Sequence, residues 1–191
     1  MVIIETKFKM PIFLGAEHES YKINIENLAR IKDSKIFNNS DPAHAAIVLG
    51  NIMNTANFDL KIFAGNFNGA VSDHDYYLTA LDGYLKRKLP LTIIFEKDPN
   101  PKSLALALLD RYSDNNSNLS VRKIKADINV SNNLHFTIAD SRMFRLERSS
   151  ENYQARCSFN NRTVAGLLES EFSALHYASE SIDYKELIKA N

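Results

Sequence analysis

Three side chains that could do chemistry lie close together in the segment 133–140, namely Asn133, His135 and Asp140. An imidazole transfers protons near neutral pH, a carboxylate can orient an imidazole, and a carboxamide offers both a donor and an acceptor. Groups of these kinds can serve in acid–base or nucleophilic catalysis and in polar ligand sites. Residue types alone do not make this segment a functional site, and what singles it out is its place in the order of elements along the chain.

Two further asparagines extend this candidate. Asn66 lies in the loop 65–69, which follows an apolar run, and Asn152 lies in the polar run 149–152. Because ligands in open α/β sheets bind at the carboxyl ends of the strands, we expect the loop around Asn66 at a ligand-binding edge. The expected lining of a polar cleft is Asn66, Asn133, His135, Asp140 and Asn152.

A plainer interpretation of the same residues stays open. A histidine at the start of an apolar strand, such as His135, is often a surface or half-buried residue that belongs to no site. Asp140 fits ordinary turn chemistry at a tight connection between two strands. A purely structural role of this kind predicts no polar cleft and no affinity for a ligand.

Other groups of polar residues carry weaker signals. The run Asp73-His74-Asp75 offers metal-ligand types, but adjacent residues at the start of a helix splay apart, and Asp73 fits an N-cap. His18 and His44 have no partners at ligand spacing, so no metal site is expected. The basic run 86–88 fits the solvated C-terminal end of a helix.

Composition narrows the classes of function. The 191 residues include 23 Lys+Arg and 23 Asp+Glu, so the net charge is zero. A neutral chain is not expected to bind nucleic acid or anionic membranes through a broad electrostatic surface. One cysteine, Cys157, excludes an intramolecular disulfide and a multi-cysteine zinc site, and it fits a small core residue. No long apolar run predicts a membrane span and the start of the chain does not resemble a signal peptide, so the cytoplasm is the expected compartment.

Apolar periodicity predicts alternating helices and strands. Residues 1–40 are predicted to form an extension with a strand over 3–13 and a helix near 21–31, which pack on a main domain of residues 41–191. The predicted strands of the main domain are 60–64, 91–95, 119–124, 135–139, 143–147 and 154–159. Its predicted helices are 42–57, 73–85, 101–112, 163–179 and 184–188. The fold class is α/β, with a mixed sheet and helices on both faces.

Over residues 42–179, this order of elements resembles one half of the phospholipase D superfamily. The segment 81–95 is similar to the family's helix, basic turn and second core strand. The segment 133–140 lies where the family has its His-x-Lys-x4-Asp signature, and the helix 163–179 resembles the one that ends such domains. In the family, the signature histidine forms a covalent phospho-intermediate, while Lys and Asn neutralise phosphate oxygens.

The chain departs from this signature in either alignment. With Asp140 at the family's Asp, Asn133 falls at the nucleophilic histidine and His135 at the lysine, and the family's Gly-Ser step becomes Glu147-Arg148. An amide nitrogen has no available lone pair, so Asn133 cannot replace the nucleophile.

If His135 is the nucleophile instead, Thr137 replaces the lysine and Arg142 replaces the aspartate. The charge clamp on the phosphate is then lost.

We therefore interpret the chain as a catalytically inactive phospholipase D-like module that acts as a binding or assembly subunit, in a bacterial protein complex. A protein partner or a second copy of the chain is favoured, and a nucleic acid or phosphate-containing ligand is a further option. No cofactor and no metal are expected, and no catalytic residue is assigned. The alternative is a phosphodiesterase or nuclease that uses His135, with Asp140, in a homodimer.

Overall fold

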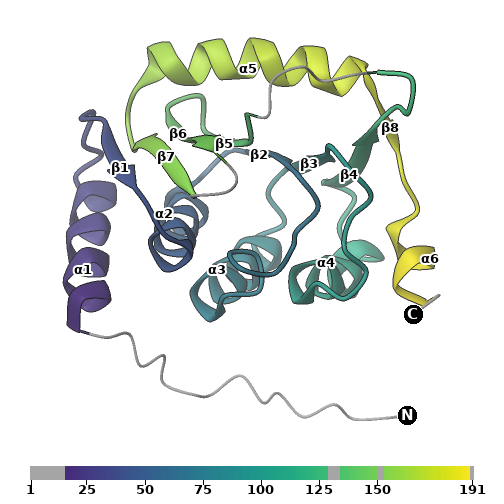
Figure 1. Cartoon of the computed structure of the whole chain (residues 1–191), viewed down its shortest axis with the longest axis horizontal. Helices are drawn as coiled ribbons and strands as arrows, with labels where there is room; N and C mark the ends of the chain where they lie inside the picture. The colour runs from purple at the N-terminus through teal and green to yellow at the C-terminus, as the bar shows by residue number, and fades with distance from the viewer. Residues whose placement is uncertain (1–15, 129–133, 150–152, 190–191) are drawn as a thin grey trace.

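The computed structural model describes residues 16–128, 134–149 and 153–189. Eight strands form one mixed sheet in the order β1-β7-β6-β5-β2-β3-β4-β8 (Figure 1). The strands are β1 (Phe37–Asn39), β2 (Leu60–Ala64), β3 (Leu91–Phe95), β4 (Leu119–Ile124), β5 (Phe136–Ala139), β6 (Met143–Ser149), β7 (Gln154–Ser158) and β8 (Ser179–Ser181). The helices are α1 (Ala16–Arg30), α2 (Pro42–Thr55), α3 (Asp75–Lys86), α4 (Leu104–Ser113), α5 (Arg162–Tyr177) and α6 (Tyr184–Lys189).

The centre of the sheet is parallel and its flanks are antiparallel. Strands β2, β3 and β4 run parallel and are linked by α3 and α4, whereas β5, β6, β7 and β1 pair antiparallel on one side and β8 does so on the other. Parallel neighbours need a crossover connection, which the two helices supply. The chain turns between β5 and β6 at Asp140 and Ser141, which both adopt positive φ angles, and the N–H of Arg142 donates to the carbonyl of Ala139 at 3.2 Å to close the turn.

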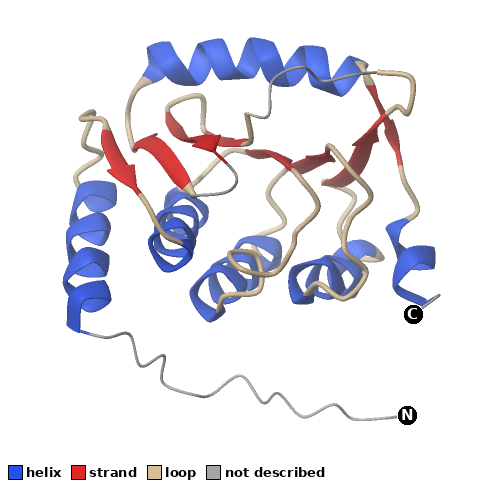
Figure 2. Cartoon of the chain, in the orientation of Figure 1, coloured by secondary structure: helices blue, strands red, loops and turns tan. Residues whose placement is uncertain are grey.

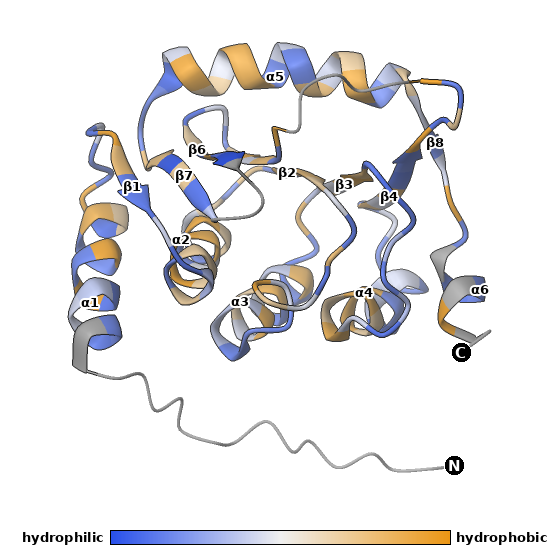
Figure 3. Cartoon of the chain, viewed as in Figure 1, coloured by the Kyte–Doolittle hydropathy of each residue, from blue (hydrophilic) through white to orange (hydrophobic). Residues whose placement is uncertain are grey.

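Helices cover both faces of the sheet, as the sequence predicted. Helix α5 lies along one face, and α2, α3 and α4 lie on the other (Figure 2). Each face has its own apolar cluster, one under α5 that includes Phe136 and Phe172, and a larger one that includes the buried residues of α2. The residues from Ala45 to Met53 are all buried, because α2 is enclosed by α1, α3 and the sheet. Figure 3 shows hydrophobic and hydrophilic segments alternating along α5, which buries one side.

Apolar periodicity predicts most of these elements correctly. The strands expected at 60–64, 91–95 and 119–124 are observed as β2, β3 and β4, and the helices expected at 42–57 and 163–179 are observed as α2 and α5. Strands β1 and β8 were not predicted, because three largely polar residues are too few to show alternation.

Two helix starts differ from the prediction. His74, not Asp73, is the N-cap of α3, and its ring accepts a hydrogen bond from the backbone N–H two residues later. Asp73 instead accepts a 2.8 Å hydrogen bond from the hydroxyl of Ser103, the N-cap of α4. Pro101 consequently precedes α4 and does not form its first turn.

The described part of the predicted extension shares the sheet and the core. Helix α1 packs against α2 and buries Ile25 and Ala29, and β1 pairs with β7 as an edge strand. The strand expected over residues 3–13 lies outside the described residues. Within the described ranges, no helix combines the length and the apolar character needed to cross a membrane.

Candidate functional site

A pocket of about 290 Å³ opens at the carboxyl ends of β2 and β3. Its walls come from the loop after β2, the residues after β3, the start of β5 and the strand β6. The polar and charged residues of its lining are Asn66, Asn68, Ser72, Glu96, Lys97, His135, Thr137, Arg145 and Glu147, together with the phenols of Tyr77 and Tyr153. This is the edge at which the sequence predicted a ligand site.

Strand pairing explains why these residues meet. The parallel pairing of β2 with β3 continues past both strands, because the N–H of Glu96 donates to the carbonyl of Ala64 at 2.8 Å and that of Lys97 donates to the carbonyl of Gly65 at 3.1 Å. Strand β5 runs antiparallel to β2, so it begins where β2 ends. His135, the residue before β5, therefore lies beside Gly65.

His135 is held by a carboxylate. Its Nε2 lies 3.0 Å from Oε2 of Glu96, and both side chains are largely buried. The carbonyl of His135 accepts a 2.8 Å hydrogen bond from the N–H of Glu147, which fixes the backbone beneath the ring. A carboxylate on one ring nitrogen orients the imidazole, the arrangement found in acid–base and nucleophilic sites.

Gly65 leaves room for this ring. A Cβ at this position would lie 3.1 Å from Cε1 of His135, closer than side chains ordinarily pack. The absence of a side chain at Gly65 therefore lets the imidazole lie directly against the end of β2.

A second, buried ion pair forms the far wall. Arg145 donates to Oε2 of Glu147 at 3.4 Å and to Oδ1 of Asn39 at 3.1 Å, and a further N–H of its guanidinium donates to the carbonyl of Tyr153. Arg145 is 5% exposed and Asn39 is 2% exposed. Buried charges persist when they are paired and hydrogen-bonded, and the network linking β1, β6 and β7 meets that condition.

The basic groups of the pocket are therefore largely paired within the protein. Of the three basic side chains in the lining, His135 is bonded to Glu96 and Arg145 to Glu147. The third, Lys97, is exposed and makes no ion pair with any residue that the structure describes. A ligand in the pocket meets two carboxylates as well as the basic groups.

The structure brings two of the predicted site residues together and places a third elsewhere. Asn66 and His135 both line the pocket, but Asp140 lies at the opposite end of β5. Its carboxylate accepts hydrogen bonds from the backbone N–H groups of Asn57 at 3.0 Å and Phe58 at 2.8 Å, so it holds the loop between α2 and β2. Asn133 and Asn152 lie outside the described residues.

Sequence reasoning missed Glu96, Arg145 and Glu147. Glu96 follows β3 directly, as the loop of Asn66 follows β2, so the argument from strand ends applies to it equally. Arg145 and Glu147 are two apart in a strand, a spacing that puts both side chains on one face. Charged residues at this spacing inside an apolar hairpin were a signal for a buried pair.

Three other candidates from the sequence do not form a functional site among the described residues. Arg87, predicted to be solvated, donates to the carbonyls of Ala56 at 2.6 Å and Met53, at the C-terminal end of α2. Burial raises the pKa of the Cys157 thiol to about 12, so it is a poor nucleophile at neutral pH. The run 73–75 does not gather into a metal-ligand group in the part of the chain that the structure describes.

Comparisons of the sequence with protein-family models and with curated proteins find no match. The structure, in contrast, matches solved structures. Nuc from Salmonella typhimurium, a phospholipase D family member, is 13% identical with a TM-score of 0.59, over 78% of this chain and 99% of Nuc. NucT from Helicobacter pylori is 15% identical with the same TM-score, over 78% of this chain and all of NucT. The chain has a phospholipase D-like fold.

The archaeal chromatin protein TrmBL2, which shows a novel mode of DNA binding, is a third match. It is 17% identical with a TM-score of 0.55, and the match covers 87% of this chain and 62% of TrmBL2. The predicted fold class and the predicted resemblance are thereby confirmed at the level of the phospholipase D-like fold. A shared fold does not establish a shared function, so the function of the pocket must be inferred from its own residues.

Proposed function

We propose that the chain is a binding module with a phospholipase D-like fold, which holds a small ligand in the His135 pocket and does not cleave phosphodiesters. One observation carries the proposal: the two largely buried basic side chains of the pocket, His135 and Arg145, are already bonded to Glu96 and Glu147. The basic groups that would stabilise a phosphoryl group are therefore compensated within the protein.

The chemistry of phosphoryl transfer explains why this matters. Such reactions depend on positive charge that is aimed at the phosphoryl oxygens. With His135 at the signature histidine, the position of the family's lysine is taken by Thr137, an uncharged residue that is 4% exposed. A cation, Arg145, lies directly opposite Thr137 on β6, but it is bound to Glu147.

The lining also favours one class of ligand. The carboxylates of Glu96 and Glu147 accept hydrogen bonds and repel anions, and the amides of Asn66 and Asn68 add further donors and acceptors. A volume of about 290 Å³ fits a small molecule or one end group of a larger one. We therefore expect a ligand without net negative charge that offers hydroxyl, amide or amino donors.

A second candidate function rests on the pair of His135 and Glu96. A carboxylate-held imidazole in a pocket is the geometry of a nucleophile or a general base, and the matched Nuc is a phospholipase D family member. Because this chain supplies one His135, this candidate requires a homodimer in which two copies of the residue face each other.

A binding screen tests the ligand class. The midpoint of thermal unfolding is measured with neutral polyols, amides and amines, and separately with inorganic phosphate and a dinucleotide. The measurements are made on the wild type, His135→Ala and the control His176→Ala. We expect stabilisation by a neutral or cationic compound that is lost in His135→Ala and kept in His176→Ala, whose imidazole is exposed on α5. Stabilisation only by phosphate compounds, lost in His135→Ala, would overturn the proposed ligand class.

Light scattering of the same samples tests the second candidate. That candidate requires a dimer with phosphodiester cleavage that disappears in His135→Ala. A monomer without cleavage excludes it and leaves the binding module.

A further inference from the structure

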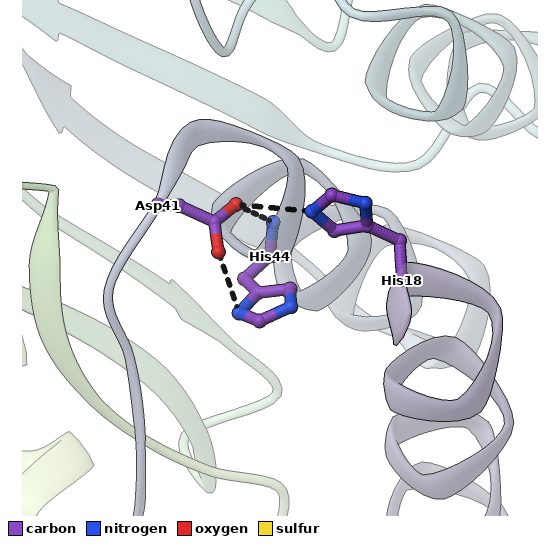
Figure 4. A group of neighbouring side chains, drawn as sticks. All are labelled: His18, Asp41 and His44. Carbon is purple, nitrogen blue, oxygen red and sulfur yellow. Dashed lines mark hydrogen bonds and ion pairs between the residues drawn. The ribbon is translucent and has the colours of Figure 1, made fainter. Parts of the chain in front are cut away.

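Two histidines and an aspartate meet where α1 packs against the start of α2 (Figure 4). His44 Nδ1 lies 2.8 Å from Oδ2 of Asp41, and His18 Nε2 lies 4.0 Å from Oδ1 of the same carboxylate. One ligand atom from each residue lies within 4.8 Å of the other two. The expectation that His18 and His44 lack partners at ligand spacing is wrong, because the packing of two helices brings together residues that are far apart in sequence.

Local structure fixes two of the three side chains. Asp41 is the N-cap of α2 and accepts a 2.9 Å hydrogen bond from the N–H of His44. The ring of Tyr21 stacks on that of His44, with centroids 3.6 Å apart and planes inclined by 16°. The imidazole of His44 is thus oriented before any ligand binds, which lowers the entropy cost of binding.

We propose that His18, Asp41 and His44 form a binding site for a divalent transition-metal ion such as Zn²⁺, which ties α1 to the start of α2. This site is independent of the His135 pocket, since none of the three residues lines that pocket. The ion takes Nε2 of His18, Nδ1 of His44 and a carboxylate oxygen of Asp41.

The distances are close to those that a bound ion requires. Zinc lies about 2.0–2.2 Å from nitrogen and oxygen ligands in tetrahedral geometry, which puts its ligand atoms about 3.3 Å from one another. To reach this separation, the 4.0 Å gap between Nε2 of His18 and Oδ1 of Asp41 must shorten by about 0.7 Å, and the 2.8 Å contact between Nδ1 of His44 and Oδ2 of Asp41 must lengthen by about 0.5 Å. Both shifts lie within the range of side-chain rotation. Three protein ligands leave one coordination position for water.

The donor set selects the class of metal. Two imidazoles with one carboxylate suit zinc, cobalt, nickel or copper, whereas magnesium and calcium prefer oxygen ligands. The side chains of His18 and Asp41 are 39% and 36% exposed, so an ion can enter from solvent. His44 is less exposed, at 15%, and lies on the inner side of the site.

The alternative is that Asp41 and His44 are only a capping pair and that His18 is a surface residue. A metal titration separates the two accounts. The tag-free full chain is stripped with a chelator and titrated with Co²⁺, followed by its visible absorption, and Zn²⁺ is then added as a competitor. Calorimetry with Zn²⁺ and with Mg²⁺ gives affinity and stoichiometry.

The variants are chosen to keep the fold. His18→Ala removes an exposed ligand, and Asp41→Asn keeps a good N-cap while it removes the charge. We expect one Zn²⁺ per chain in the wild type and in the control His176→Ala, affinity lower by at least about ten-fold in both site variants, and no binding of Mg²⁺. We also expect Zn²⁺ to raise the midpoint of thermal unfolding in the wild type and much less in His18→Ala.

Two results would overturn the proposal. One is the absence of Zn²⁺ binding to the wild type at micromolar concentration. The other is binding that is equal in the wild type, His18→Ala and Asp41→Asn, since the ion would then use other residues. Circular dichroism of each variant confirms that the fold is retained before the affinities are compared.

Discussion

His135 Nε2 and Glu96 Oε2 lie 3.0 Å apart although the two residues are 39 positions apart in the sequence. The pair connects the start of β5 to the end of β3 across β2, which lies between these two strands in the sheet. The two residues meet because β2 and β3 are parallel and end side by side, while the antiparallel strand β5 begins where they end. The same pair supports two chemistries, ligand binding and acid–base catalysis, and the surrounding charges distinguish between them.

Gly65→Ala is expected to displace His135 while the fold is kept. The added Cβ would lie 3.1 Å from Cε1 of the ring, so the imidazole must shift, and this disturbs its contact with Glu96. Affinity for the ligand found in the binding screen falls, and the NMR signals of the His135 ring shift. Unchanged affinity together with unshifted ring signals would show that the close approach of Gly65 to the ring has no role.

Arg145→Met is expected to lower the free energy of unfolding by about 3–5 kcal/mol, because Glu147 is left as a buried charge without its partner. The double variant Arg145→Met/Glu147→Gln loses less than the sum of the two single variants, since no buried charge remains. Urea denaturation measures each value. Lys97→Met is the control and changes stability by less than about 0.5 kcal/mol. Additive single effects would contradict direct pairing.

Asp140→Ala is expected to destabilise the fold by about 2–3 kcal/mol and to leave ligand affinity unchanged. The carboxylate accepts from backbone N–H groups of the loop between α2 and β2, at the end of β5 away from the pocket. Asp140→Asn is the matched control, because asparagine tolerates the positive φ of this position and keeps one acceptor oxygen. A loss of affinity in Asp140→Ala without a loss of stability would return this residue to the site.

These positions show which parts of the structure the sequence could predict. Strands such as β2 and β3 are short apolar runs bounded by loops, so local pattern determines them. The contact between His135 and Glu96, and that between His18 and Asp41, depend on strand order and helix packing, which are properties of the whole fold. Asp140 was grouped with His135 because the resemblance places both in one family signature, but here β5 lies between them and carries them to opposite ends of the strand.

The attachment of α5 to the sheet is expected to depend on pH. Glu169 on α5 accepts hydrogen bonds from Lys61 on β2 and from Ser141 in the β5–β6 turn, both at 2.9 Å. Partial burial opposes ionisation of Glu169, but the two hydrogen bonds and the charge of Lys61 outweigh it and hold its pKa below the ordinary value of 4.5. A carboxyl whose pKa is depressed by folding stabilises the protein above its unfolded pKa, and this contribution is lost as the pH falls through the folded value.

Glu169→Gln is therefore expected to be less stable than the wild type by about 0.5–1 kcal/mol near pH 7, with the difference shrinking as the pH falls through the depressed pKa of Glu169. Urea denaturation over this range of pH gives the comparison, with the exposed Glu171→Gln as control. A difference between wild type and Glu169→Gln that stays constant down to the lowest pH would show that the ionised carboxylate does not contribute.

The most direct test of the central claim is an assay of phosphodiester cleavage under single-turnover conditions, with labelled single-stranded DNA and a chromogenic phosphodiester. Wild type and His135→Ala are assayed side by side with excess protein. The account predicts that both substrates remain intact with either protein, because the buried basic groups of the pocket are bound to Glu96 and Glu147. Cleavage by the wild type that disappears in His135→Ala would contradict it and make the chain an enzyme.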